Sequence, residues 1–320
     1  MEIIGHKTQW EFLKNLAKRD KVPQALLFTG VDSVGKRKIA LEFIKLLNCQ
    51  EKDFQQKPCQ KCLHCSLIEK MKHPDVILIT PKNKEIQINQ IRELQKKLNF
   101  QPQLSSFKSV IIDKAEALNP MAQNCLLKTL EEPPGKTLFL LITSQPHLLL
   151  ETIRSRCGIL KFYPVKPEEI ESSFKKTISP QIRILAEGRP GRVIEFLNQP
   201  EKFEGWLKTI KAIQNLFTGG IPERFEFVKK FFEKENSHFS LPLFLEIFNE
   251  YLRIVFLKKL GIKNKNLEVF SIPSNLENYS ILKIKKIIEE VQNLKVLISS
   301  TNVNPKLACL LYTSPSPRDS

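Results

Sequence analysis

The first half of the chain alternates short apolar runs with longer stretches whose apolar residues recur at helical intervals. Five runs have the length of β-strands and are rich in Val, Ile, Leu and Phe: residues 24–30, 75–80, 109–113, 138–144 and 158–165. Helical spacing dominates between them, for example in RKIALEFIKLLN and INQIRELQKKLNF. Because strands that alternate with helices require crossover connections, we expect a parallel five-stranded sheet with helices on both faces.

Beyond Pro164 the apolar spacing is helical. Three short segments punctuated by Pro and Gly precede a longer region with helical spacing and no internal repeat. These patterns predict an α/β domain over residues 1–165, a small helical domain over 166–202 and an all-α domain over 203–308.

The end of the chain, CLLYTSPSPRDS, departs abruptly from this helical pattern. Residues 309–319 can be back-translated into the transposase adapter used in sequencing libraries. We therefore expect residues 309–320 to be adapter read-through and the natural C-terminus to be missing. A natural disordered tail is the alternative.

The 320 residues have the composition of an ordinary globular protein, with 42% hydrophobic and 26% charged residues. No apolar run approaches the roughly 18–20 residues of a membrane span, and MEIIGHKTQW lacks the features of a signal peptide. We therefore expect a cytoplasmic protein, in which clustered cysteines favour metal binding over disulfides. The net charge of +16 suits contact with nucleic acid or an acidic protein surface, although a solvated lysine-rich surface would give the same charge.

The stretch GVDSVGKRKIA, residues 30–40, follows the first apolar run and opens a helical stretch. Gly30, Gly35 and Lys36 have the spacing of a P-loop, whose backbone N–H groups and lysine hold the phosphates of a nucleotide. The next position of a P-loop carries a Ser or Thr hydroxyl that ligates magnesium, but here it is Arg37. A guanidinium has no acceptor atom and repels a cation. A nucleotide could therefore still dock through Lys36, whereas magnesium-assisted hydrolysis is predicted to be lost.

A second acidic element supports this interpretation. The apolar run SVIID ends in Asp113, where P-loop enzymes place the aspartate that holds magnesium. Enzymes that hydrolyse the nucleotide follow it with a glutamate, but this chain has Lys114, and Glu116 lies two residues further on. Two altered positions argue against ATP hydrolysis more strongly than either one alone. The alternative is that Asp113 only caps a turn.

The cysteines give a more specific signal. Four of them follow the spacing C-x9-C-x2-C-x2-C: Cys49, Cys59, Cys62 and Cys65. Four thiolates suit tetrahedral zinc, and a complete shell leaves no open position for catalysis, so we expect a structural zinc knuckle inserted at residues 49–65. His64 is an alternative ligand, and we expect it instead to be a surface residue. Free buried cysteines are the other interpretation.

The stretch LNPMAQNCLLKTLEEPPG predicts a helix that begins at Pro120 after the N-cap Asn119 and ends before Pro133. The apolar residues of one face of this helix are expected to lie in the core: Met121, Cys125, Leu126 and Leu130. Periodicity does not explain the acidic pair that precedes the prolines.

The stretch TIRSRCG, residues 152–158, places Arg154 and Arg156 on a predicted loop before the fifth apolar run. An arginine on a rigid loop at a subunit edge can stabilise charge on a phosphate that a neighbouring subunit transfers. Spacing alone favours a solvated basic turn. Cys157, like Cys125, is expected to be a packing residue.

Together these motifs resemble the delta-prime family of bacterial DNA polymerase III clamp-loader subunits, within the AAA+ superfamily. The resemblance covers about residues 5–200 and rests on LLFTGVDSVGKRKIA, the four cysteines, HPDVILI, VIIDKAEALNPMAQNCLLKTLEEPPG and LLETIRSRC. It implies an AAA+ P-loop module, a helical lid and an all-α collar that builds a five-subunit ring. The helical C-terminal region agrees with the family only in length and character.

The resemblance also implies roles for individual residues. Ser155, Arg156 and Cys157 would form a Ser-Arg-Cys motif, with Arg156 as the finger that reaches the ATP of an adjacent ATPase subunit, which reverses the basic-turn interpretation. Thr143 and Arg192 fall at the first and second sensor positions of the degenerate nucleotide site. The implied function is that of a non-hydrolysing stator in the DNA-directed DNA polymerase holoenzyme. It would help the gamma/tau and delta subunits to load the sliding clamp onto primer–template DNA.

This chain departs from the family's ATPase subunits at Arg37 and Lys114, where those subunits have Thr or Ser and Glu, which places it with the non-hydrolysing subunit. Its first cysteine gap is one residue longer than the commoner spacing, which should not prevent zinc binding. Two other functions stay open. An active ATPase, either the motor subunit of the same loader or a related AAA+ enzyme, would have to tolerate both substitutions. A zinc-knuckle nucleic-acid binder would need stacking aromatic residues, and only Phe54 lies near the knuckle.

Overall fold

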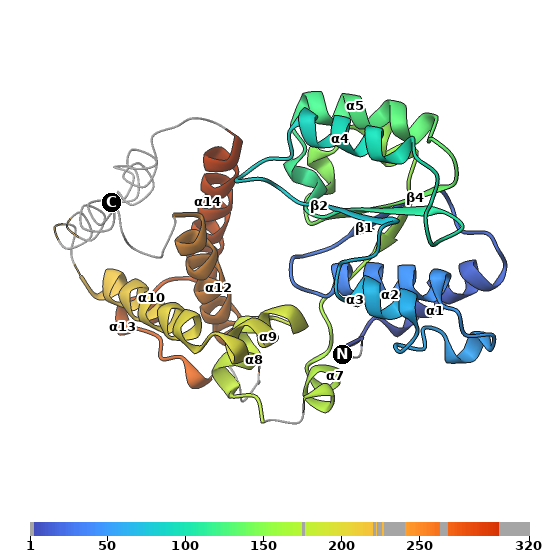
Figure 1. The fold of residues 1–320 in the computed structure, drawn as a ribbon. Helices are drawn as coiled ribbons and strands as arrows, with labels where there is room; N and C mark the ends of the chain where they lie inside the picture. The colour runs from blue at the N-terminus through green and yellow to red at the C-terminus, as the bar shows by residue number, and fades with distance from the viewer. Residues whose placement is uncertain are drawn as a thin grey trace. The chain divides into compact units, whose positions relative to one another are not determined.

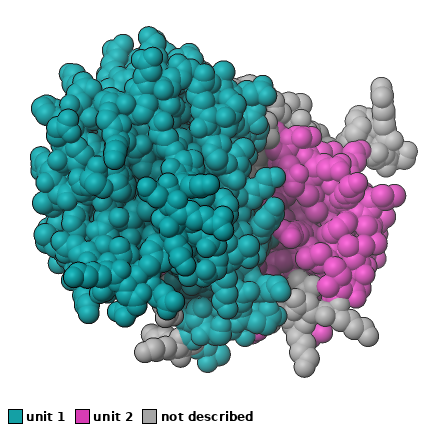
Figure 2. Space-filling model, turned by 90° about the vertical axis from the view of Figure 1, so that its right-hand side faces the viewer, with its two compact units in different colours: residues 1–177, 186–193 teal, residues 178–185, 194–320 magenta. Residues whose placement is uncertain are grey.

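The computed structural model describes residues 3–174, 177–219, 222, 226, 241–262 and 268–300. The chain divides into two compact units, residues 1–177 with 186–193 and residues 178–185 with 194–320 (Figure 2). The three predicted domains, with boundaries after residues 165, 202 and 308, stay a prediction. The predicted read-through at 309–320 lies outside the described residues.

The first unit contains the predicted parallel sheet of five strands. These are β1 (Ala25–Thr29), β2 (Val76–Ile79), β3 (Lys108–Ile112), β4 (Thr137–Thr143) and β5 (Gly158–Lys161). They pair in the order β2-β3-β4-β1-β5, and every pair is parallel, with Leu27 of β1 opposite Leu141 of β4. Because parallel strands end at one edge, this order brings together the P-loop after β1, Asp113 after β3 and Thr143 at the end of β4.

Helices cover both faces of the sheet, as predicted (Figure 1). One face carries α1 (Lys7–Lys18), α2 (Lys36–Asn48) and α3 (Leu63–Glu69), and the other carries α4 (Ile88–Leu98) and α5 (Pro120–Glu131). Shorter helical turns complete the unit: η1 (Phe54–Gln56), η2 (Ala115–Ala117), η3 (Pro146–Leu148), α6 (Glu151–Ser155) and α7 (Pro167–Ser173). This unit therefore has the P-loop and the helix-covered parallel sheet that the sequence predicted.

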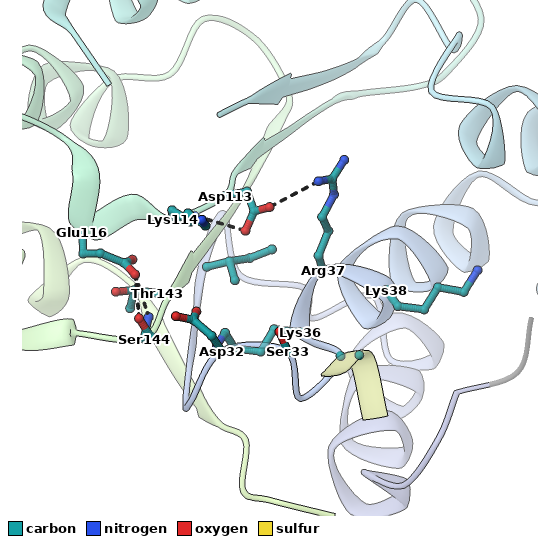
Figure 3. A pocket seen from close by; sticks show the side chains of 13 residues that line it. Asp32, Ser33, Lys36, Arg37, Lys38, Asp113, Lys114, Glu116, Thr143 and Ser144 are labelled. Carbon is teal, nitrogen blue, oxygen red and sulfur yellow. Dashed lines mark hydrogen bonds and ion pairs between the residues drawn. The ribbon is translucent and has the colours of Figure 1, made fainter. Parts of the chain in front are cut away.

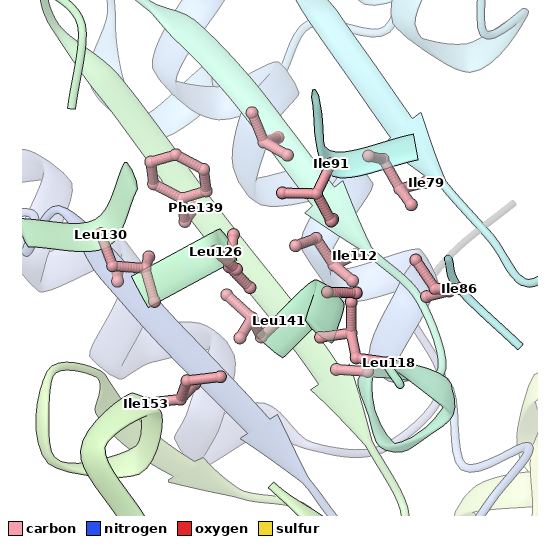
Figure 4. Close-up of a cluster of buried hydrophobic side chains, with 14 of the residues drawn as sticks. Ile79, Ile86, Ile91, Ile112, Leu118, Leu126, Leu130, Phe139, Leu141 and Ile153 are labelled. Carbon is pink, nitrogen blue, oxygen red and sulfur yellow. The ribbon is translucent and has the colours of Figure 1, made fainter. Parts of the chain in front are cut away.

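A buried apolar cluster holds α4 and α5 against the sheet (Figure 4). Ile91, Leu126 and Phe139 in this cluster are fully buried. The predicted start of α5 is confirmed, because the Asn119 side chain accepts a hydrogen bond of 2.8 Å from the N–H of Ala122. The expectation for Met121 is wrong: it is 65% exposed, because the buried face of α5 runs through Ala122, Leu126 and Leu130, and Met121 lies to one side of that face.

The described part of the second unit is helical, which agrees with the predicted all-α region. Its helices, two of which cross the unit boundary, are α8 (Pro180–Ala186), α9 (Pro190–Asn198), α10 (Pro200–Thr218), α12 (Leu241–Lys259), α13 (Ser274–Glu277) and α14 (Ile281–Ser300). α12 packs against α10 and α14, and Ile247, Tyr251 and Val255 of α12 are fully buried. Among the helices described, none combines the length and apolarity that crossing a membrane requires.

Candidate nucleotide site, cysteine knuckle and arginine motif

The P-loop connects β1 to α2 at the carboxyl edge of the sheet (Figure 3). Gly30 has a φ of 144°, and a Cβ there would lie 2.2 Å from the carbonyl oxygen of Phe162, so only glycine fits. Gly35, with a φ of 109°, is the N-cap of α2. Both glycines that the motif requires are therefore also required by the backbone.

The P-loop lysine is bonded to its own loop. Lys36 is 5% exposed, and its Nζ donates hydrogen bonds to the carbonyl oxygens of Gly30 at 2.5 Å and Val31 at 2.8 Å. Burial lowers the pKa of Lys36, although the charge of Asp32 opposes this shift. A phosphate would have to replace both carbonyl contacts in order to use this lysine.

The two positions that would share a magnesium ion instead face each other across the site (Figure 3). Arg37 Nη1 lies 3.4 Å from Asp113 Oδ2. The other carboxylate oxygen, Oδ1, accepts a hydrogen bond of 3.1 Å from the N–H of Lys114. Both oxygens of Asp113 thus already have hydrogen-bond donors as partners.

Another acidic group of the site, Glu116, is turned toward the end of β4. Glu116 Oε1 accepts hydrogen bonds from the N–H of Ser144 at 3.3 Å and from its hydroxyl at 2.7 Å. Thr143, at the first sensor position, is 1% exposed, and its Oγ1 accepts a hydrogen bond of 3.1 Å from the N–H of Gln145. Neither side chain is therefore free of a protein partner.

A cavity of about 320 Å³ joins most of the predicted nucleotide residues. Gly35, Lys36, Asp113 and Thr143 line it, together with Arg37, Lys38, Lys114 and Glu116. Gly30 does not line the cavity, but its carbonyl oxygen accepts a hydrogen bond from Lys36, which does. Arg192 is 6% exposed and does not line it, whereas its neighbour Gly191 does and donates a backbone hydrogen bond of 2.8 Å to Ser33.

The Ser-Arg-Cys residues lie at the end of α6, where a loop was predicted. The one-turn helix places Arg156 at its C-cap, and Arg156 Nη1 donates a hydrogen bond of 2.9 Å to the carbonyl oxygen of Thr152. An ion pair joins Arg156 Nη2 to Glu131 Oε1, a contact that spacing did not predict. Ser155 is exposed, and its hydroxyl donates to the same Thr152 oxygen at 3.1 Å. Arg156 does not line the cavity at the P-loop.

Cys157 and Cys125 both pack against the core beneath α5, as expected of packing residues. Burial raises the pKa of the Cys157 thiol to about 11, so it stays protonated near neutral pH.

The four predicted metal ligands come together, with their sulfur atoms all within 4.8 Å of one another. Ligands about 2.3 Å from a tetrahedral zinc lie roughly 3.8 Å apart, so the cluster needs little closure to fit the ion. Backbone N–H groups of Cys59 and Cys62 donate to the sulfurs of Cys49 and Cys59, each at 3.3 Å. Such donors stabilise thiolates, the form that binds a metal.

His64 is buried, so the expectation of a surface histidine is wrong. Its Nδ1 lies 2.9 Å from Nε2 of His73, which is also buried. His73 Nδ1 in turn accepts a hydrogen bond of 3.2 Å from the N–H of Asp75. His64 lies within the knuckle and His73 just before β2, so their contact connects the knuckle to the start of that strand.

A buried lysine ties the knuckle to α2. Lys45 is 1% exposed, and its Nζ donates hydrogen bonds of 2.9 Å both to Glu42 Oε1 and to the side-chain oxygen of Gln60, between two of the cysteines. It also pairs with Glu69 of α3. Sequence reasoning missed this cluster, although the i,i+3 spacing of Glu42 and Lys45 on a helix was a signal for it.

Replacing this lysine with methionine should lower the free energy of unfolding by about 2 kcal/mol, because Glu42 would stay buried with Lys38 as its remaining cationic partner. Burial alone would raise the pKa of Glu42, but hydrogen bonds from Lys45, Lys38 and Gln60 outweigh it and lower the pKa below its usual 4.5. The loss should therefore be full at neutral pH and shrink as Glu42 protonates below pH 4.5. Denaturant titrations at several pH values measure it, with exposed Lys70→Met as the control; an equal loss in both variants would contradict the prediction.

Comparison of the sequence with known proteins places this chain in a family. The family described as DNA polymerase III, delta subunit, matches residues 5–166. The DNA polymerase III subunit delta' of Bacillus subtilis is 34% identical over 76% of this chain and 76% of its own length. The subunit tau of the same organism is 30% identical over 69% of this chain, but over only 41% of its own length. The subunit delta' of Pseudomonas aeruginosa is 39% identical over 44% of each chain. The chain described here therefore belongs to the delta-prime family of DNA polymerase III clamp-loader subunits.

Proposed function

We propose that this chain is a stator of the clamp loader, which hydrolyses no ATP itself and donates Arg156 to the ATP of a neighbouring subunit. Its partners would be the gamma/tau ATPase and delta subunits of a hetero-pentamer and, through that assembly, the sliding clamp and primer–template DNA. The observation that carries the proposal is the ion pair between Arg37 and Asp113.

Hydrolysis at a P-loop requires a divalent cation between the loop hydroxyl and the aspartate, and a group that orients the attacking water. Here a permanently charged guanidinium already pairs with Asp113, so magnesium would have to enter against its repulsion. Lys114 supplies a second positive charge where the orienting glutamate is needed. A nucleotide could dock passively on the loop only after Lys36 gives up its bonds to the loop carbonyls.

The position of Arg156 supports action on another subunit. Its side chain is 37% exposed at the end of α6 and lies outside the chain's own cavity. A guanidinium that reaches a phosphate from an adjacent subunit stabilises the negative charge that spreads over the transferring group. This role requires exposure and a fixed direction, and Arg156 has both.

Cys49, Cys59, Cys62 and Cys65 would hold a zinc ion. An all-thiolate shell leaves no position open for water or substrate, so the ion would only stabilise the knuckle. The contacts of Lys45 with Gln60 and Glu69 would transmit that stability to α2, whose N-terminus forms part of the P-loop.

Purified alone, the chain should show negligible DNA-stimulated ATP turnover, because its cation position is taken by Arg37. Phosphate release with and without primed DNA measures this, and Lys36→Ala should leave the background rate unchanged. Substantial turnover that Lys36→Ala abolishes would contradict the proposal and would indicate an active ATPase.

A further inference from the structure

The helix α5 ends in the acidic pair Glu131-Glu132, which the apolar periodicity does not explain. In the structure Glu131 has a specific partner, because its Oε1 forms an ion pair with Nη2 of Arg156. The other terminal nitrogen of Arg156 donates to the carbonyl oxygen of Thr152 at 2.9 Å. The guanidinium is thus held from two sides, by a carboxylate of α5 and by the backbone of its own helix.

The elements that carry these two partners are fixed to each other. The side chain of Gln123 in α5 accepts a hydrogen bond of 2.8 Å from the N–H of Leu150, the N-cap of α6. The same side chain donates to the carbonyl oxygen of Leu148 at 3.2 Å. Ile153 of α6 is fully buried in the cluster beneath α5. The distance from Glu131 to Arg156 is therefore set by a rigid frame.

We propose that Glu131 is the positioning residue for Arg156, which it holds in one direction before the neighbouring ATP arrives. This inference rests on the proposed function, because it requires Arg156 to act in trans. An unrestrained arginine samples many rotamers, and orienting a catalytic group in advance removes that cost from the reaction. The guanidinium has five N–H donors, so the two contacts leave others free for a phosphate.

The pair is suited to positioning because it does not trap the arginine. Glu131 is 47% exposed and Arg156 is 37% exposed, so water screens their attraction. A phosphate carries more negative charge than one carboxylate. It can therefore accept hydrogen bonds from the guanidinium N–H groups that Glu131 and Thr152 leave unused, because the exposed ion pair holds Arg156 only weakly.

The test uses the full chain assembled with its ATPase and delta partner subunits. Arg156→Ala defines the part of the ATP turnover that depends on the finger. Glu131→Gln should lower kcat for that part by about tenfold and leave KM for ATP unchanged, because it disturbs orientation and not nucleotide binding. Glu132→Gln, which makes the same change at the adjacent exposed residue, should have no effect.

A double variant separates positioning from a general structural effect. If Glu131 acts through Arg156, Glu131→Gln adds no further loss to Arg156→Ala, and the melting temperature of Glu131→Gln equals that of the wild type. Additive losses, or equal kcat values for Glu131→Gln and Glu132→Gln, would overturn the inference while the finger itself stands. Full ATP turnover of the assembly with Arg156→Ala would overturn both the proposed function and this inference.

Discussion

ATP turnover by the assembled clamp loader should fall when Arg156 is replaced by alanine. The guanidinium would stabilise charge on the transferring phosphate of the adjacent subunit, and arginines that act in trans contribute on the order of 10³-fold at the site they serve. The isolated chain has no turnover to lose in this proposal, so the effect should exist only in the assembly. Steady-state ATP hydrolysis with sliding clamp and primed DNA measures it.

Two control variants make the result specific. Arg156→Lys keeps the charge but loses the planar pair of terminal nitrogens, so it should restore little of the turnover. Arg19→Ala removes an exposed arginine at the C-cap of α1 and should leave turnover unchanged. Assembly of each variant with the partner subunits must equal that of the wild type. Normal turnover with Arg156→Ala in an intact assembly would remove the basis for the proposed stator.

The strands were predictable because a parallel sheet that is covered on both faces needs continuous apolar segments. β4, for example, is buried along its whole length, and its sequence TLFLLIT has no polar residue between its ends. α1 was not predicted: only Leu13 in it is fully buried, while Trp10 and Leu16 are partly buried against the same core. Met121 was placed wrongly because the buried face of α5 runs through its neighbour Ala122, and consecutive helical residues point about 100° apart.

Local spacing also predicted the residues of the candidate sites, since the P-loop and the knuckle each depend on neighbours in sequence. It could not predict which distant side chains would meet. Contacts such as Glu131 with Arg156 and His64 with His73 depend on which elements pack together. The acidic end of α5 gave one hint, because apolar periodicity left it unexplained. Predicting its partner required the arrangement of α5 and α6.

The second large effect should come from the cysteine knuckle. The purified chain should contain about one zinc ion, and Cys65→Ser should lose it, because Cys65 is 1% exposed and completes a shell of four sulfurs. Structural zinc sites bind with roughly 10 kcal/mol or more, so the knuckle should not keep its fold once the ion is removed. The loss should reach α2 through Lys45, which bonds to Gln60 within the knuckle.

Elemental analysis measures the zinc content and thermal unfolding measures the stability, each before and after chelation. Cys125→Ser is the matched control, because Cys125 lies outside the cluster and is only partly buried. It should keep its zinc, and chelation should lower its melting temperature as much as that of the wild type. A chain that carries no zinc, or equal metal loss from Cys65→Ser and Cys125→Ser, would contradict the structural zinc site, since four converging sulfurs would then be only a packing cluster.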